Sequence, residues 1–195
     1  MKNLLKDTKS LTILSVMLAI TIIMDVTPLG AIPLGAISAT IMHIPTIITG
    51  IILGPIAGFI MGTLLGIISL LHALTRPMTP LDPLFINPLV SVLPRMFIGV
   101  VSYYTYTGMK QFIKKGNVQE SISAIIAGIT GSLTNTILVF LMLYLVYAQE
   151  VAEQLGIAFE TLFLSVLTTN AIAEALVSAV LTAAIIVAYK SYTKN

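Results

Sequence analysis

Residues 75–95 read TRPMTPLDPLFINPLVSVLPR and hold five of the chain's nine prolines. So many prolines end any helix that precedes them and predict an irregular loop. The stretch ends on Arg95, and the residues that follow are apolar enough to lie in a membrane. On a helix, Asn87, Ser91 and Arg95 recur every four residues and form one polar stripe. A cation in hydrocarbon needs a partner, so we predict that this segment forms the entrance and one wall of a binding cavity.

The composition of the 195 residues indicates a membrane setting. Hydrophobic residues make up 57% and charged residues only 9%, and the mean hydropathy of +1.02 lies outside the range of soluble domains. A helical span needs about 20 residues, so there is room for roughly six spans and no soluble domain. The chain has no cysteine, which excludes a disulfide framework and thiolate metal sites. The net charge of +2 gives no indication of a nucleic-acid partner, and we expect none.

We therefore predict an all-α membrane protein, one domain of residues 1–195 built as a bundle of six transmembrane helices. Loops rich in proline and glycine and short polar turns separate the predicted helices, which cover about residues 11–26, 37–53, 56–74, 87–109, 121–147 and 160–189. With six spans, eight of the ten basic residues fall on one side of the membrane. The positive-inside rule then places both termini in the cytoplasm and the 27–36, proline-rich and 148–160 loops outside.

Polar residues inside the predicted helices carry the functional argument. Counting about 1.5 Å per residue from the outer helix ends places several of them in the outer half of the membrane or near its midplane. These residues are Arg95, Asn135, Asn170, Glu174 and His43. Together with Asn87 and Ser91, they predict a ligand pocket that opens outward.

Structural roles compete with this interpretation. In the structural alternative, Arg95 and Glu174 form an ion pair in which each neutralises the other. This alternative is compatible with a binding site if the ligand displaces the pairing. Asn135 and Asn170 would also serve as interhelical hydrogen bonds, and a lone histidine such as His43 is more often a hydrogen-bonded structural residue. The competing class is a membrane structural or assembly protein without a small ligand.

Small residues predict two close helix contacts. A ladder at a spacing of four runs through the second and third predicted helices and favours packing within the chain; its members are Gly50, Gly54, Gly58, Gly62 and Gly66. Ser15 and Ala19 give the first helix a small flat patch, suited to internal packing or to docking on another membrane protein.

Enzyme chemistry finds little support. The chain has no HExxH, GxSxG or Walker motif, and a nucleophile–base pair for an intramembrane hydrolase cannot be assembled. Two histidines about thirty residues apart make a weak metal site. We predict a protein that is not an enzyme and carries no metal or cofactor, and any ATP hydrolysis would belong to a partner.

Nearly the whole chain resembles the S components, the substrate-binding membrane subunits of energy-coupling factor (ECF) vitamin transporters. The runs ATIMHIPTIITGIILGPIAGFIMGTLLG and PLDPLFINPLVSVLPR are similar to the pantothenate-type branch. Ser15 and Ala19 match the family's small-xxx-small motif, with serine in place of the usual first alanine. The resemblance implies that the first helix docks on a transmembrane coupling subunit (the T component), which two cytoplasmic ATPases drive. It also implies a multi-pass protein of the bacterial cell membrane that topples to carry its vitamin inward.

Pantothenate is the vitamin that we expect. Arg95 would bind its carboxylate through a charge-assisted hydrogen bond, and Asn135, Asn170 and Glu174 would take its hydroxyl and amide groups. The alternatives are hydroxymethylpyrimidine, pyridoxine or riboflavin, with Arg95 as a structural residue. The chain has no tryptophan, which weighs against a large stacking ligand such as riboflavin.

Overall fold

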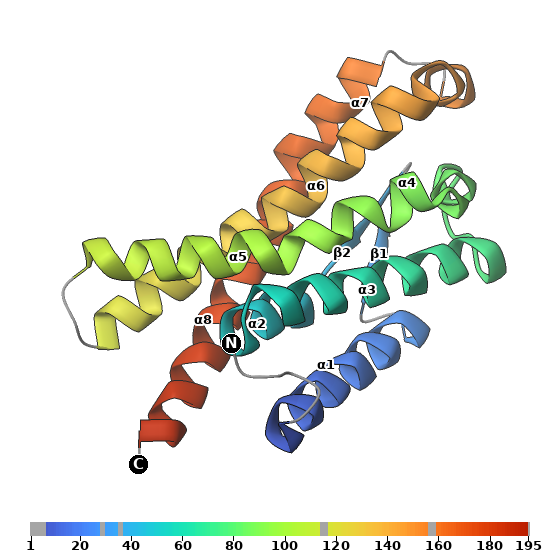
Figure 1. Cartoon of the computed structure of the whole chain (residues 1–195). Helices are drawn as coiled ribbons and strands as arrows, with labels where there is room; N and C mark the ends of the chain where they lie inside the picture. The colour runs from blue at the N-terminus through green and yellow to red at the C-terminus, as the bar shows by residue number, and fades with distance from the viewer. Residues whose placement is uncertain (1–6, 28–29, 35–36, 114–116, 156–158, 195) are drawn as a thin grey trace.

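The computed structural model describes residues 7–27, 30–34, 37–113, 117–155 and 159–194. Within these ranges the chain is a bundle of helices with one short two-stranded hairpin (Figure 1). Four helical segments are long and apolar enough to cross a membrane, and they are Thr8–Val26, Pro55–Thr75, Val118–Val151 and Phe163–Thr193. The chain is therefore a membrane protein of helical class.

Helix α1 (Thr8–Val26) lies along the edge of the bundle (Figure 1). The Asp7 side chain caps it by accepting a hydrogen bond from the backbone N–H of Lys9. Thr21 is the one residue of α1 that is buried. Most of its apolar side chains therefore face the surroundings of the bundle.

A hairpin occupies part of the segment expected to be the second helix. Strands β1 (Ala31–Leu34) and β2 (Ile37–Thr40) pair antiparallel, with Ala31 opposite Thr40. Helix α2 (Ile44–Leu53) therefore begins at residue 44, and the prediction of a helix from residue 37 is wrong. Pro45 suits this start, because its fixed φ and missing N–H are tolerated in the first turn. At 10 residues, α2 is about 15 Å long and too short to span a hydrocarbon core of about 30 Å.

The glycine ladder packs α2 and α3 (Pro55–Thr75) closely on α5 (Leu93–Phe112). A Cβ at Gly58 would collide with the backbone of Gly99, and one at Gly62 with the backbone of Arg95. Gly50 meets Gly99 of α5 in the same way, and Gly66 meets the backbone of Ser91 and Val92 just before α5 begins. The predicted internal packing is confirmed at these positions. Gly54 has open space around it and instead takes the left-handed φ of +100° that turns the chain between α2 and α3.

The proline-rich segment folds into a 3₁₀ helix, η2 (Asp82–Ile86), and a single helical turn, α4 (Pro88–Ser91), before α5 begins. The Asp82 carboxylate fixes the loop by accepting hydrogen bonds from the N–H groups of Met78 (2.6 Å) and Thr79 (2.8 Å) and from the Thr79 hydroxyl (2.6 Å). The predicted fourth helix is thus interrupted at Val92. Pro94 accounts for the break, because it cannot donate to the carbonyl of Val90.

The C-terminal half consists of α6 (Asn117–Leu155), α7 (Phe159–Val166) and α8 (Ile172–Lys194), and a π-helical turn, η3 (Leu167–Ala171), joins α7 to α8. Helix α6 bends at Tyr147, whose φ and ψ of −135° and 23° are not helical. Helices α6 and α7 run side by side at one end of the molecule (Figure 1).

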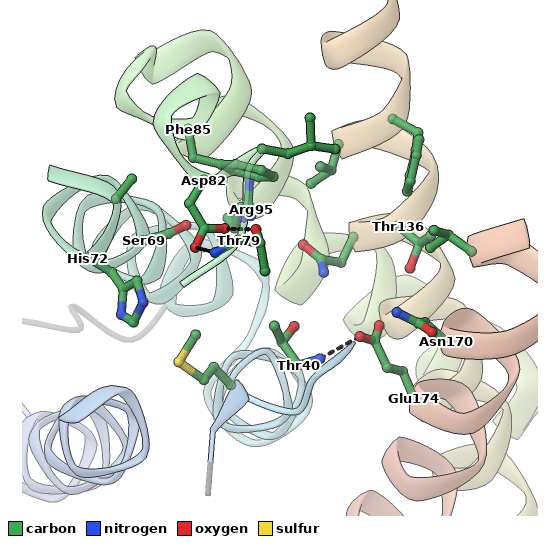
Figure 2. Close-up of a pocket in the computed structure, with 17 residues that line it drawn as sticks. Thr40, Ser69, His72, Thr79, Asp82, Phe85, Arg95, Thr136, Asn170 and Glu174 are labelled. Atoms are coloured by element: carbon green, nitrogen blue, oxygen red, sulfur yellow. Dashed lines mark hydrogen bonds between the residues drawn. The ribbon is translucent and has the colours of Figure 1, made fainter. Parts of the chain in front are cut away.

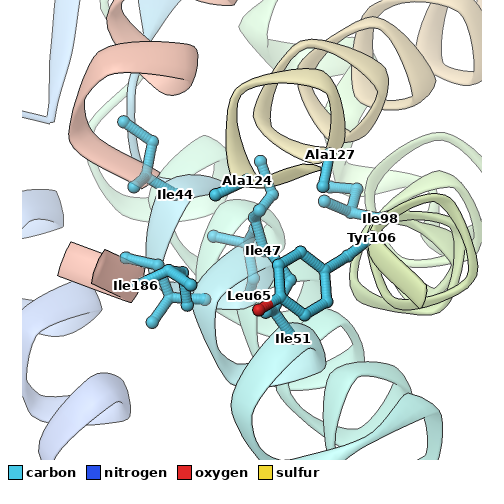
Figure 3. Packing of buried hydrophobic residues seen from close by; sticks show 10 residues of the cluster. Ile44, Ile47, Ile51, Leu65, Ile98, Tyr106, Ala124, Ala127 and Ile186 are labelled. Atoms are coloured by element: carbon cyan, nitrogen blue, oxygen red, sulfur yellow. The ribbon is translucent and has the colours of Figure 1, made fainter. Parts of the chain in front are cut away.

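One buried hydrophobic cluster joins five helices (Figure 3). It takes Ile47 from α2, Leu65 from α3, Ile98 from α5, Ala127 from α6 and Ile186 from α8. These side chains are almost fully buried, so the helices that line the cavity described below are held together by their own packing.

Candidate binding site

A cavity of about 110 Å³ lies between α3, the proline-rich loop, α5, α6 and the α7–α8 junction (Figure 2). It has room for far more than one water molecule. Its lining mixes one guanidinium, one imidazole, two carboxylates, two amides and four hydroxyls with a set of apolar side chains. The lining residues are Thr40, Met42, Ser69, His72, Ala73, Thr79, Leu81, Asp82, Phe85, Arg95, Asn135, Thr136, Val139, Phe140, Val166, Asn170 and Glu174.

Arg95 enters the cavity from the first turn of α5, held by contacts that carry no charge. Its Nη1 donates to the carbonyl oxygen of Val90 at 2.5 Å. This is the acceptor that Pro94 leaves without a backbone donor, so the guanidinium occupies the place of the missing helical hydrogen bond. Its Cζ also lies 5.1 Å from the centre of the Phe85 ring, within the range of a cation–π contact.

Glu174 lies on the opposite wall, at the start of α8, and is buried. Its Oε1 accepts a hydrogen bond of 2.5 Å from the backbone N–H of Thr40 in β2 (Figure 2). Among the described residues, the ion pairs within 4.0 Å join Asp25 to His72 and to Arg76, and Lys110 to Glu120. Arg95 and Glu174 therefore share a cavity without forming an ion pair.

Two asparagines complete the polar lining on the side of α6 and α8. Asn135 projects from α6, and its Oδ1 is buried without a hydrogen-bond partner among the described residues. Asn170 lies in the π-helical turn and accepts a hydrogen bond from the hydroxyl of Thr169 at 3.1 Å. Single π turns inside α-helices are frequent at functional sites, because they turn side chains away from the regular helical positions. Buried amides with unused hydrogen-bonding groups are suited to a polar ligand.

Three residues predicted for the site lie outside the cavity lining. Asn87 caps α4 by accepting from the N–H of Leu89 (3.0 Å), and its Nδ2 donates to the Tyr147 hydroxyl (3.1 Å). Ser91 is buried and donates to the carbonyl of Asn87. The buried His43 pairs through Nε2 with the hydroxyl of Ser178 at 2.8 Å.

Ser15 and Ala19 are both exposed on α1. Their small patch is therefore not used for packing within the described part of the chain. It forms part of an outward apolar surface with Val16, Ile20 and Ile23.

Several lining residues were not among the sequence predictions. Thr40 contributes a backbone N–H, which no side-chain pattern reveals, and Phe85 belongs to the proline-rich loop that the sequence did single out. His72 lines the cavity but was not among the predicted site residues. Its partner Asp25 was also missed, and the available signal was an acidic residue at the end of an apolar run. The described residues hold no group of three histidine, aspartate or glutamate side chains placed to bind a metal ion.

Comparison with known proteins shows the family of the chain. Residues 9–186 match the family described as the ECF transporter substrate-specific component. The chain is also 27% identical, over 173 residues, to the pantothenic acid transporter PanT of Lactococcus lactis subsp. cremoris (strain MG1363), a match that covers 82% of this chain and 81% of that protein. Because the family match covers most of the chain, this protein belongs to the substrate-specific components of ECF transporters.

Proposed function

We propose that this S component binds pantothenate in the cavity and delivers it to an ECF transporter. The observation that carries the proposal is Arg95, a guanidinium in the cavity with no carboxylate within 4.0 Å among the described residues. A charge removed from water without a partner is costly. An anionic ligand supplies the missing partner.

The rest of the cavity matches the other groups of pantothenate, which has one carboxylate, one amide, two hydroxyls and a dimethyl carbon. Asn135, Asn170 and Glu174 offer donors and acceptors for the hydroxyls and the amide. Val139 and Phe140 offer an apolar surface for the methyl groups. A carboxylate on Arg95 would form a charge-assisted hydrogen bond, stronger than a neutral one. Asn87, Ser91 and His43 have structural partners and are not part of this proposed contact set.

A neutral vitamin precursor fits the cavity less well. Hydroxymethylpyrimidine and pyridoxine carry no carboxylate, so either would leave the Arg95 charge uncompensated. The similarity to PanT also supports an anionic pantothenate over these alternatives.

The proposal includes six passes of the chain through a bacterial plasma membrane, with both termini in the cytoplasm. The hairpin and the short helix α2 together make one of these passes. The clustering of lysines near the two ends of the sequence and at residues 110–115 supports this orientation. Family membership supports a transmembrane T component and two ATPases as partners. The exposed Ser15–Ala19 patch of α1 is the surface that we propose for docking on the T component.

The test is to purify the protein from cells, identify any bound small molecule by mass spectrometry, and measure thermal unfolding with a panel of vitamins. We expect pantothenate to co-purify and to raise the melting temperature, since a ligand at about 100 times its Kd stabilises the folded state by about 2.7 kcal/mol. A neutral pyrimidine, pyridine or flavin in its place would show that the vitamin is wrong while the transport class holds. If no small molecule co-purifies and none stabilises the protein, a structural or assembly role is favoured.

A further inference from the structure

A buried carboxylate links α1 to the cavity wall. Asp25, in the last turn of α1 and at its external end in the proposed orientation, has a side chain that is only 6% exposed. Its Oδ1 lies 2.8 Å from Nδ1 of His72, and its Oδ2 lies 2.5 Å from Nη2 of Arg76. Both partners belong to the end of α3 or its cap. Arg76 neutralises the negative charge of the Asp25 carboxylate, so the contact between Asp25 and His72 is a hydrogen bond to a neutral imidazole.

This contact decides which nitrogen of His72 remains available. An ionised carboxylate only accepts hydrogen bonds, so Nδ1 carries the proton that it donates to Asp25. In the neutral ring Nε2 is then an acceptor. His72 lines the cavity, its side chain is 16% exposed, and Nε2 has no hydrogen-bond partner in the described part of the chain.

We infer that Nε2 of His72 accepts a hydrogen bond from a hydroxyl or amide N–H of the ligand, and that Asp25 is the positioning residue that fixes this orientation. The inference rests on the proposed function and adds a contact on α3, across the cavity from Asn170 and Glu174 (Figure 2). Arg95 selects for a negative charge at one point of the ligand. His72 selects for a hydrogen-bond donor at another, so an anion without a donor group would be excluded.

The contact also connects the ligand to α1. Asp25 is part of α1, while Glu174 holds Thr40 of the hairpin that follows α1. The cavity is therefore tied to this N-terminal segment at two places, on α3 and on α8. A role that is only structural would use the Asp25–His72 contact and leave Nε2 without a function.

Two substitutions separate these roles. In His72→Asn the amide nitrogen lies near the position of Nδ1, so the variant keeps the contact to Asp25 and loses Nε2. In His72→Gln the amide group reaches the position of Nε2 and gives up the contact to Asp25. We expect pantothenate affinity to fall about tenfold in His72→Asn and by only about threefold in His72→Gln. Without ligand, we expect His72→Gln to lower the melting temperature more than His72→Asn does, because it gives up the contact to Asp25. The inference would be overturned if His72→Asn bound pantothenate as tightly as the wild-type protein and the less stable His72→Gln bound it more weakly.

A second measurement does not depend on the identity of the vitamin. The chain has two histidines, so ¹⁵N-histidine labelling gives two pairs of ring-nitrogen signals, Nδ1 and Nε2 of each imidazole. The pair that is lost in His72→Asn belongs to His72. At pH 8, where free imidazole is neutral, the ligand-free protein is expected to show His72 protonated on Nδ1 alone and to lose this preference in Asp25→Ala. A proton on Nε2 would overturn the inference. If the wild-type protein shows the expected tautomer but does not bind pantothenate, the vitamin assignment fails and the orientation of His72 by Asp25 stands.

Discussion

The guanidinium of Arg95 is held in place without being neutralised. Its contacts are a backbone carbonyl and an aromatic ring, both uncharged, and the nearby Glu174 is engaged by a backbone N–H of the hairpin. A residue selected for stability alone would have an ionic partner in this setting. A charge that is oriented but unpaired is instead expected at a site that binds an oppositely charged ligand, where function takes precedence over stability.

The two arginines of the chain provide a matched test of this difference. Without ligand, we expect Arg95→Met to change the melting temperature little, because removal of an uncompensated charge offsets the loss of the hydrogen bond to the carbonyl of Val90. We expect Arg76→Met to lower stability by about 1 kcal/mol, because it removes an ionic partner of the buried Asp25. Thermal unfolding in detergent measures both. A loss of about 3–5 kcal/mol in Arg95→Met would indicate a buried ion pair and contradict the account.

Ser91 belongs to the polar stripe that the sequence predicted but not to the lining of the observed cavity. Its hydroxyl bonds the carbonyl of Asn87 and does not line the cavity. Pantothenate affinity in Ser91→Ala is expected to match that of the wild-type protein, as measured by equilibrium binding. A tenfold weaker affinity with unchanged stability would place Ser91 in contact with the ligand.

The difference between stripe and cavity has a physical reason. A spacing of four residues places side chains on one face only if the helix is continuous. The break at Val92, caused by Pro94, separates Asn87 and Ser91 on α4 from Arg95 on α5. The convergence of Arg95 with Asn135, Asn170 and Glu174 in one cavity was predicted by depth along the membrane, which does not depend on helical phase.

At the scale of elements, the close contact between α3 and α5 positions the start of α5 against the cavity. Gly62 makes this possible, since a Cβ there would collide with the backbone of Arg95. We expect Gly62→Ala to lower stability by about 1–3 kcal/mol through overpacking and to weaken ligand binding by displacing Arg95. Gly108→Ala on α5 is the matched control, because a Cβ there has open space, and alanine in a helix is favoured by about 0.5–1 kcal/mol. Equal effects of the two changes on melting temperature and affinity would show that the contact does not position the site.

The helices were predictable where long apolar runs end at proline, glycine or charged residues, as in α3. The hairpin was not predicted, because residues 37–40 continue without a break into the apolar run of α2, and a short apolar run does not distinguish a strand from a helix. The π-helical turn at Asn170 also leaves no pattern in the sequence. The hairpin contributes the N–H of Thr40, which the sequence did not reveal, whereas Asn170 was predicted although the π turn around it was not. His72 was missed on the regular helix α3, because a histidine near a helix end carries no signal of a cavity.

At the scale of the whole molecule, the orientation in the membrane is testable because the chain has no cysteine. Single cysteines can replace exposed residues, Met78 in the proline-rich loop and Phe112 and Tyr192 near the ends of α5 and α8. We expect a membrane-impermeant maleimide to label Met78→Cys in intact cells, and to label Phe112→Cys and Tyr192→Cys only after permeabilisation. Labelling of all three sites from the same side would contradict six spans with cytoplasmic termini.

The central claim is that Arg95 binds the carboxylate of pantothenate, and the most direct test is a cycle of four titrations. Isothermal calorimetry compares pantothenate with panthenol, in which an alcohol replaces the carboxylate, on the wild-type protein and on Arg95→Met. We predict that Arg95→Met weakens pantothenate binding by about 30-fold or more, a coupling of about 2 kcal/mol, and leaves the weaker binding of panthenol unchanged. Equal losses for both ligands, or a wild-type protein that binds panthenol as tightly as pantothenate, would contradict the account.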